Sequence, residues 1–235
     1  MKRLYDKNPL TFSLIWISVY VVTFSIADSL SAMLGTEKVI TAPLCAVMTA
    51  TLLCWLKRNG MLEQYGITAV KMPCKQYMYF LPLLLLVSTN LWGGVTLRYG
   101  ALESVLYVIS MVGVGVLEEL IFRGFLFKAL CKSSIKRAVI ISSLTFGIGH
   151  IVNLLNGAEF LPTLLQILYA SAAGFLFTVI FLRSGSLIPC IIAHSTINSL
   201  SAFGAERSPG MDMLAAVFLT VVSVGYALWI LKKTE

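Results

Sequence analysis

Eight long apolar segments divide the chain, and each is close to the length that a helix needs to cross a bilayer. Within each segment the apolar residues are continuous and do not alternate with polar ones. Continuous runs of about 20 apolar residues are typical of transmembrane helices, whereas alternation is typical of barrel strands. The predicted spans are roughly 10–34, 39–56, 77–97, 105–127, 138–155, 160–182, 187–203 and 213–231. The pattern therefore predicts an all-α, multi-pass transmembrane helical bundle of about eight helices.

The basic residues test this count, because cytoplasmic loops of membrane proteins carry an excess of Lys and Arg. With eight spans and both termini cytoplasmic, 14 of the 18 Lys and Arg residues fall on the cytoplasmic side. Lys38, Arg98 and Arg207 fall on the outer side, and Arg123 lies within a span. One missed helix would invert every later loop and destroy this asymmetry. We therefore expect both termini to be cytoplasmic.

Composition agrees with an integral membrane protein. The chain has 235 residues, of which 58% are hydrophobic and 12% are charged. Soluble domains are nearer 45–50% apolar and about 25% charged. The net charge of +7 does not indicate nucleic-acid binding, because the basic residues occupy short loops and do not form one polar face. We expect a single integral membrane domain over residues 1–235, with the lipid bilayer as its surroundings.

Ionisable residues inside the predicted spans are the strongest functional signal. The fourth span contains Glu118, Glu119 and Arg123, and the chain's two histidines, His150 and His194, lie in the fifth and seventh. Each ionised side chain at the centre of a spanning helix costs about 2.5–3.5 kcal/mol, so such residues usually mark function. At about 1.5 Å per residue, Glu118, His150 and His194 lie roughly 10–18 Å from the predicted cytoplasmic ends. We expect them to converge in the cytoplasmic half of the bilayer.

Helical spacing separates the two acids of the fourth span. Glu119 and Arg123 are four residues apart, so they share a face and can form an ion pair. Glu118 points about 100° away from that face. One glutamate is therefore expected to be held by the arginine while the other is available for chemistry. The alternative is a charge cluster that only joins helices.

The two histidine spans repeat a four-residue spacing. Phe146 and His150 share one face, with Asn153 on the same side, and His194 shares a face with Asn198. A carboxylate and an imidazole can together remove a proton from water. A second imidazole and an amide can donate hydrogen bonds to an oxyanion. These groups predict hydrolysis of a peptide bond by an activated water.

A metal mechanism is the alternative for the same residues. Glu118, His150 and His194 would make the His₂Glu ligand set of a catalytic zinc. No His-Glu-x-x-His helix supports that set directly. We therefore assign no firm metal ligand and no certain cofactor, and leave zinc open.

Three ordered motifs are similar to those of the CAAX protease and bacteriocin-processing family (CPBP, or Abi) of intramembrane proteases. They are Glu-Glu-x-x-x-Arg, Phe-x-x-x-His and His-x-x-x-Asn. In this chain the motif positions are Glu118, Glu119 and Arg123; Phe146 and His150; and His194 and Asn198. The resemblance covers a core of about residues 103–204, and the first three spans are recognised only as hydrophobic segments.

The resemblance implies an intramembrane endopeptidase of glutamate type, acting on a peptide or membrane-protein substrate in a bacterial plasma membrane. It also implies roles for the individual residues. Glu118 and His150 would activate the water, His194 and Asn198 would form the oxyanion site, and Glu119 with Arg123 would orient it, supported by Phe146 and Asn153.

Two further functions stay open from the sequence. A non-catalytic membrane binding protein, such as a bacteriocin self-immunity factor, would use the same polar site to hold a ligand. A proton-coupled transporter would give a role to Asp28 in the first span, for which we favour a hydrogen bond near the outer end of the helix.

Overall fold

A computed structural model describes residues 1–70 and 80–233 of the chain. Within these ranges there is no β-strand, only an isolated bridge between Val95 and Gly204. The elements are α1 (Lys2–Lys7), α2 (Pro9–Met33), α3 (Thr41–Arg58), α4 (Leu81–Ser88), η2 (Thr89–Leu91), α5 (Ala101–Glu118), η3 (Glu119–Phe127), α6 (Lys128–Cys131), α7 (Ile135–Gly149), α8 (Val152–Leu155), α9 (Phe160–Ser184), α10 (Ile188–Leu200) and α11 (Pro209–Lys233). The all-α prediction is confirmed.

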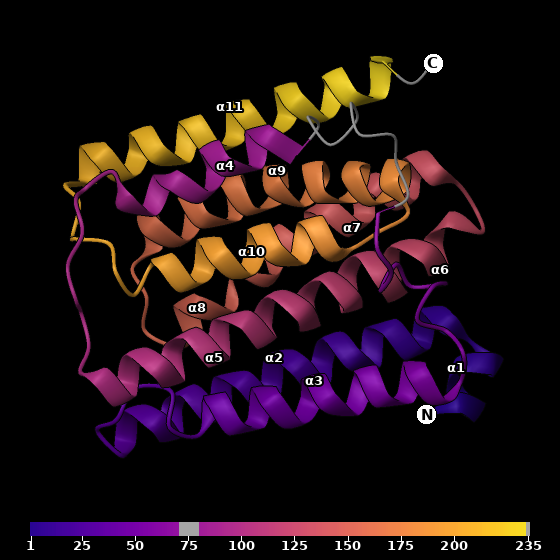
Figure 1. Cartoon of the computed structure of the whole chain (residues 1–235), viewed down its shortest axis with the longest axis horizontal. Helices are drawn as coiled ribbons and strands as arrows, with labels where there is room; N and C mark the ends of the chain where they lie inside the picture. The colour runs from indigo at the N-terminus through magenta and orange to yellow at the C-terminus, as the bar shows by residue number, and fades with distance from the viewer. Residues whose placement is uncertain (71–79, 234–235) are drawn as a thin grey trace.

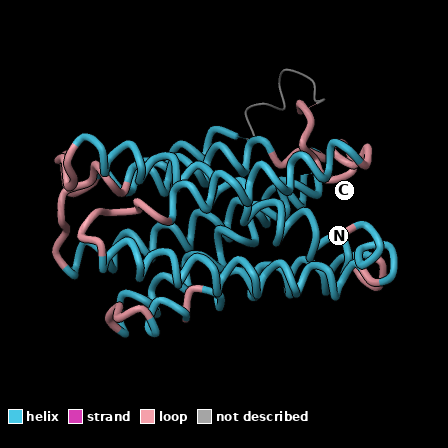
Figure 2. Tube along the Cα trace, turned by 90° about the horizontal axis from the view of Figure 1, so that it is seen from below, coloured by secondary structure: helices cyan, strands magenta, loops and turns pink. Residues whose placement is uncertain are grey.

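The long helices run side by side in a bundle whose loops gather at its two ends (Figure 2). Helix α1 and the end of α11 lie at the same end of the bundle (Figure 1). Helix α9 packs between α7 and α11, α5 packs between α3 and α10, and α2 packs on α3 and η3. The three motif-bearing segments are therefore joined by packing, α7 on η3 and α10 on α5.

Five helices are long and apolar enough to cross a membrane. They are Pro9–Met33, Ala101–Cys131, Ile135–Leu155, Phe160–Ser184 and Pro209–Lys233. The chain is thus an integral membrane protein by the length and composition of these helices. Helices α4 and α10 do not join the five, being 8 and 13 residues long, whereas a full crossing takes about 20 residues. Helix α3 has 18 residues but ends in Lys57 and Arg58, which lower its mean hydropathy. The count of eight spans stays a prediction.

Two predicted spans differ from the helices observed. Residues 77–79, where the span 77–97 begins, lie outside the described residues, and its helical part ends at Leu91. Gly94 has φ +101°, a conformation that L side chains rarely adopt, so the chain turns here. The span 138–155 is broken at His150 and Ile151, which separate α7 from α8.

Local sequence sets several helix ends. The Asn8 side chain accepts hydrogen bonds from the backbone amides of Leu10 (3.0 Å) and Thr11 (3.1 Å) at the start of α2. Ser134 caps α7 in the same way. Such side-chain caps satisfy amides that have no partner within the helix. Gly185, in the left-handed conformation, ends α9.

The fourth predicted span contains a π-helical segment. From Glu119 to Phe127 the backbone forms π-helix η3, and all nine of its residues are buried. A π-helix is rare and occurs mostly as a short segment within an α-helix, frequently at a functional site. The change from α5 to η3 falls between Glu118 and Glu119, the two acids of the first motif.

Helices α5 and α10 approach closely at a glycine. A Cβ atom added to Gly115 would collide with the backbone and hydroxyl of Ser195. Ser195 follows His194 and donates its own hydroxyl hydrogen bond to the Val112 carbonyl on α5 (3.2 Å). The absence of a side chain at Gly115 therefore fixes the distance of α10, and with it the position of His194.

We predict that Gly115→Ala forces α10 away from α5 and lowers the free energy of unfolding by about 1–3 kcal/mol, the usual cost of overpacking. The measurement is thermal unfolding of the purified protein in detergent. Gly225→Ala is the matched control, because an added Cβ there meets no atom within 4 Å. Equal stability of the two variants would contradict the close approach.

Candidate active site

A buried carboxylate joins two of the three motifs. Glu119 Oε1 lies 3.2 Å from Arg123 Nη1 and 2.8 Å from His194 Nδ1. The side chains of Glu119 and Arg123 are fully buried, and that of His194 is 8% exposed. The ion pair expected from the four-residue spacing is therefore present. Because Glu119 also accepts from the arginine, it acts as the acceptor toward His194, whose Nδ1 consequently carries the proton.

Glu118 points to a different side, as its position along the helix predicts. Its Oε1 accepts a hydrogen bond from the Tyr20 hydroxyl on α2 (2.6 Å), and its Oε2 lies 3.4 Å from His194 Nε2. The Glu118 side chain is 12% exposed. His194 thus stands between two glutamates, with Glu119 at one ring nitrogen and Glu118 at the other.

Phe146 connects all three motifs. The Arg123 guanidinium lies 4.0 Å from the centre of its ring, close enough for a favourable cation–π contact. The ring also meets His150 edge to face at 5.4 Å and His194 at 5.7 Å. Both imidazoles and the arginine are therefore positioned against one buried aromatic side chain on α7. Phe122 of η3 packs on the same ring at 5.3 Å.

His150 lies where α7 ends, and its ring is oriented by the backbone. Its Nδ1 is 3.1 Å from the Phe146 carbonyl oxygen. Since a carbonyl only accepts, Nδ1 carries the proton and Nε2 of the neutral ring is an acceptor. An unprotonated imidazole nitrogen is the form that removes a proton from water.

The reactive side chains face a cavity of about 810 Å³. Its lining includes Glu118, His150, His194, Asn153 and Asn198. Glu119 and Arg123 are not part of the lining and lie behind the reactive groups. The sequence therefore identified residues that the fold brings to one chamber.

The two asparagines of the motif region differ in their contacts. Asn153 donates to the Gln166 side chain on α9 (2.8 Å), which fixes its orientation. Asn198 lies on the cavity wall one turn beyond His194, as its spacing predicts. Asn90 donates to the Ile197 carbonyl (2.5 Å) and so joins η2 to α10 beside Asn198.

Sequence reasoning missed Tyr20 and Asn90. Both line the cavity, and neither belongs to a motif. Tyr20 carries one usable signal, because it lies near the middle of a 25-residue helix. Tyrosines of membrane helices are enriched at the interfaces, where the hydroxyl meets water. A mid-span tyrosine therefore indicates a buried polar partner. Asn90 lies in the short helical turn η2 near the end of its span and carries no such signal.

The donor set does not fit the zinc alternative. Among the described residues, no three His, Cys, Asp or Glu side chains are grouped to hold a metal ion. Both nitrogens of His194 already face carboxylates, and Nδ1 of His150 faces a carbonyl. A three-ligand zinc site needs His₂Glu donors within about 2.2 Å of one point.

These features define an integral membrane protein with a polar, acid-containing chamber enclosed by its helices. Residues 100–200 match the family model described as Rce1-like, the type II CAAX prenyl endopeptidase Rce1-like group. The resemblance predicted from the three motifs is therefore confirmed for this segment, which contains all of them. The match supports a protease. No curated protein and no solved structure matches the chain.

We predict that Arg123→Met lowers the free energy of unfolding by about 3–5 kcal/mol, because it leaves the Glu119 charge buried without its partner. Chemical or thermal unfolding in detergent measures this loss. Arg58→Met is the control, since Arg58 is exposed at the end of α3. Similar losses in both variants would show that Glu119 does not depend on Arg123.

Proposed function

We propose that the chain is an intramembrane endopeptidase that hydrolyses a peptide bond with a water activated by Glu118 and His150. One observation carries the proposal: the Glu118 carboxylate lines the cavity, while a second glutamate, an arginine and a phenylalanine behind it fix the neighbouring imidazole. A cluster that only joined helices would have no need to expose one acid to a chamber of this size.

In the proposed reaction, a water is held between Glu118 and the acceptor nitrogen of His150. As its oxygen attacks the carbonyl carbon, the proton passes to Glu118. His194 Nε2, 3.4 Å from Glu118 Oε2, can share that proton. Because Nδ1 of His194 already carries a proton, the proton shared at Nε2 makes the ring an imidazolium, and Nε2 then becomes a hydrogen-bond donor. His194 and Asn198 then stabilise the oxyanion, and the proton leaves with the amine as the C–N bond breaks.

The remaining residues support this chemistry. Glu119 and Arg123 fix the orientation of His194, and the Phe146 ring packs against both imidazoles. Tyr20 donates to one oxygen of Glu118, which leaves the other oxygen directed toward His194. The proposed setting is a bacterial plasma membrane, which the chain crosses eight times with both termini cytoplasmic, as a single domain. In this setting the substrate is a membrane-associated protein or peptide.

Glu118→Gln is expected to lower the cleavage rate by about 10²–10⁴-fold, since an amide cannot take a proton from water. His150→Ala should lower it by a similar factor. The measurement compares peptides in membranes that contain the wild type or either variant by mass spectrometry, with Glu159→Gln, an exposed acid at the cavity rim, as control.

The same comparison separates catalysis from binding. A non-catalytic immunity protein would keep its cellular effect in Glu118→Gln, because glutamine preserves the shape of the site. Peptide patterns of Glu118→Gln membranes that match those of the wild type would reject the proposed reaction.

A further inference from the structure

Among residues 1–70 and 80–233, those that line the chamber run from the reactive groups toward one end of the bundle only. Its inner end is formed by Glu118, Phe122 and His194. From there its lining continues through the last turns of α2 to Asp28 and to the segment between α8 and α9, which contributes Asn156. These are residues of the end opposite to α1 and the end of α11 (Figure 1). We call that end the rim end.

The other end of the bundle is closed by aromatic packing. Phe12 lies 5.2 Å from both Trp55 and Phe125, measured between ring centres, and Tyr65 lies 4.9 Å from Phe125. Tyr65 also donates to the hydroxyl of Tyr5 (2.6 Å). Burial, and next this hydrogen bond, raise the pKa of Tyr65 well above its ordinary value, so that the phenol stays neutral. None of these residues lines the cavity.

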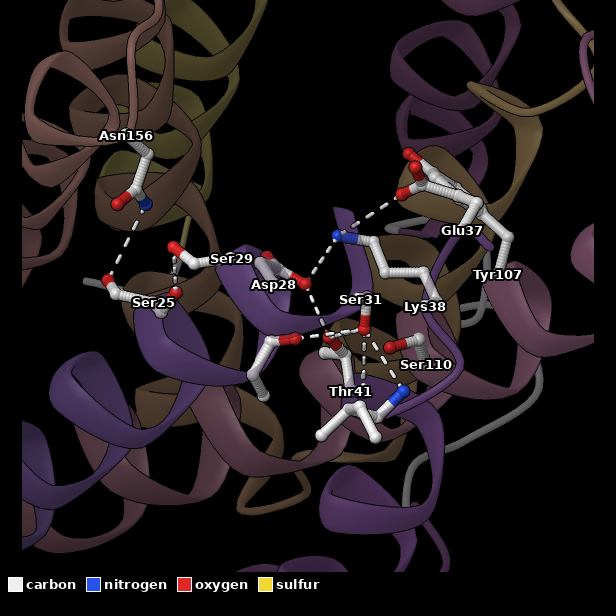
Figure 3. A network of polar contacts seen from close by, with 12 residues as sticks. Ser25, Asp28, Ser29, Ser31, Glu37, Lys38, Thr41, Tyr107, Ser110 and Asn156 are labelled. Atoms are coloured by element: carbon white, nitrogen blue, oxygen red, sulfur yellow. Dashed lines mark hydrogen bonds and ion pairs between the residues drawn. The ribbon is translucent and has the colours of Figure 1, made fainter. Parts of the chain in front are cut away.

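The rim itself is a built polar structure (Figure 3). Lys38 Nζ lies between the carboxylates of Asp28 (2.8 Å) and Glu37 (3.6 Å). Thr41 donates to the same Asp28 oxygen (2.5 Å). Lys38 has φ +59°, an uncommon conformation for a residue with a side chain. Strained backbone of this kind persists where surrounding contacts hold it, and here these contacts place the lysine over the chamber.

Across the rim, further polar side chains continue the wall. Asn156 donates to Ser25 of α2 at 3.5 Å. A second hollow of about 340 Å³ shares Asn90, Arg207 and Asp212 with the main cavity. The chamber therefore widens into polar surface at this end, which is what a route for water and peptide requires.

Charge differs sharply between the two ends. The closed end carries twelve of the described Lys and Arg residues, whereas the rim end carries three. The three are Lys38, Arg98 and Arg207, and six acids accompany them: Asp28, Glu37, Glu103, Glu159, Glu206 and Asp212. Cytoplasmic segments carry the excess of Lys and Arg. The closed end therefore faces the cytoplasm and the rim faces outward.

We propose that the substrate enters the chamber from the non-cytoplasmic side of the membrane, through the rim formed by Asp28, Lys38 and Asn156. That the entering molecule is a substrate rests on the proposed function. The direction of access rests on the cavity and the charges alone. It follows that the cleaved segment belongs to an exported or outward-facing part of a protein or peptide. A C-terminal sequence presented in the cytoplasm would meet the closed end.

The test is cysteine labelling with a charged, membrane-impermeant methanethiosulfonate on intact cells. The parent has Cys54, Cys74 and Cys131 replaced by Ser and keeps the buried Cys45 and Cys190. Met111→Cys places a thiol on the chamber wall. We expect it to react in intact cells and to lose that reactivity when a bulky peptide occupies the chamber.

Ser133→Cys is the matched variant, because Ser133 is exposed between α6 and α7 at the closed end. It should react only after the membrane is permeabilised. Asn156→Cys on the rim is a second reporter if Met111→Cys does not fold. Reaction of Ser133→Cys in intact cells, or reaction of both chamber thiols only after permeabilisation, would overturn the proposal.

Labelling needs no turnover, so it separates this inference from the proposed function. The same pattern in the Glu118→Gln background supports outward access even if no hydrolysis is found. An active enzyme with the opposite pattern would reject outward access and leave the reaction standing.

Discussion

The structure depends on one buried carboxylate. Glu119 holds an arginine four residues along its own segment and a histidine on a distant helix, with no exposed surface on the acid or the arginine. A buried charge without a partner is strongly destabilising, so η3 and α10 must pack in the register that brings these groups together. The ion pair is thus weak evidence for stability but strong evidence for a specified geometry.

Aromatic packing and helix geometry extend this constraint to the reactive groups. Phe146 contacts Arg123 on one side and both imidazoles on others, so the arginine that neutralises Glu119 also positions the ring between His150 and His194. The change from α-helix to π-helix between Glu118 and Glu119 separates the acid that is held from the acid that lines the chamber. Of these two adjacent residues, Glu119 therefore holds the fold together, whereas Glu118 faces the chamber.

The sequence predicted the helical class, the paired Glu119 and Arg123, and the meeting of Glu118 with His194, because these follow from spacing and from the cost of charge in lipid. It did not predict η3 or the break at His150, since both depend on tertiary packing that overrides the α-helical period. Tyr20 was missed because its partner lies 98 residues away. The direction of the chamber also needs the fold, because it depends on which end of the bundle the aromatic side chains fill.

The central claim, that Glu119 fixes the orientation and protonation of His194, is most directly tested by ¹⁵N NMR of histidine-labelled protein. The chain has only two histidines, so the spectrum is simple. The account predicts a proton on Nδ1 of His194 whose resonance shifts in Glu119→Gln, while that of His150 keeps its position. The account would be contradicted by an unprotonated Nδ1 on His194, or by a His194 resonance that does not shift in Glu119→Gln.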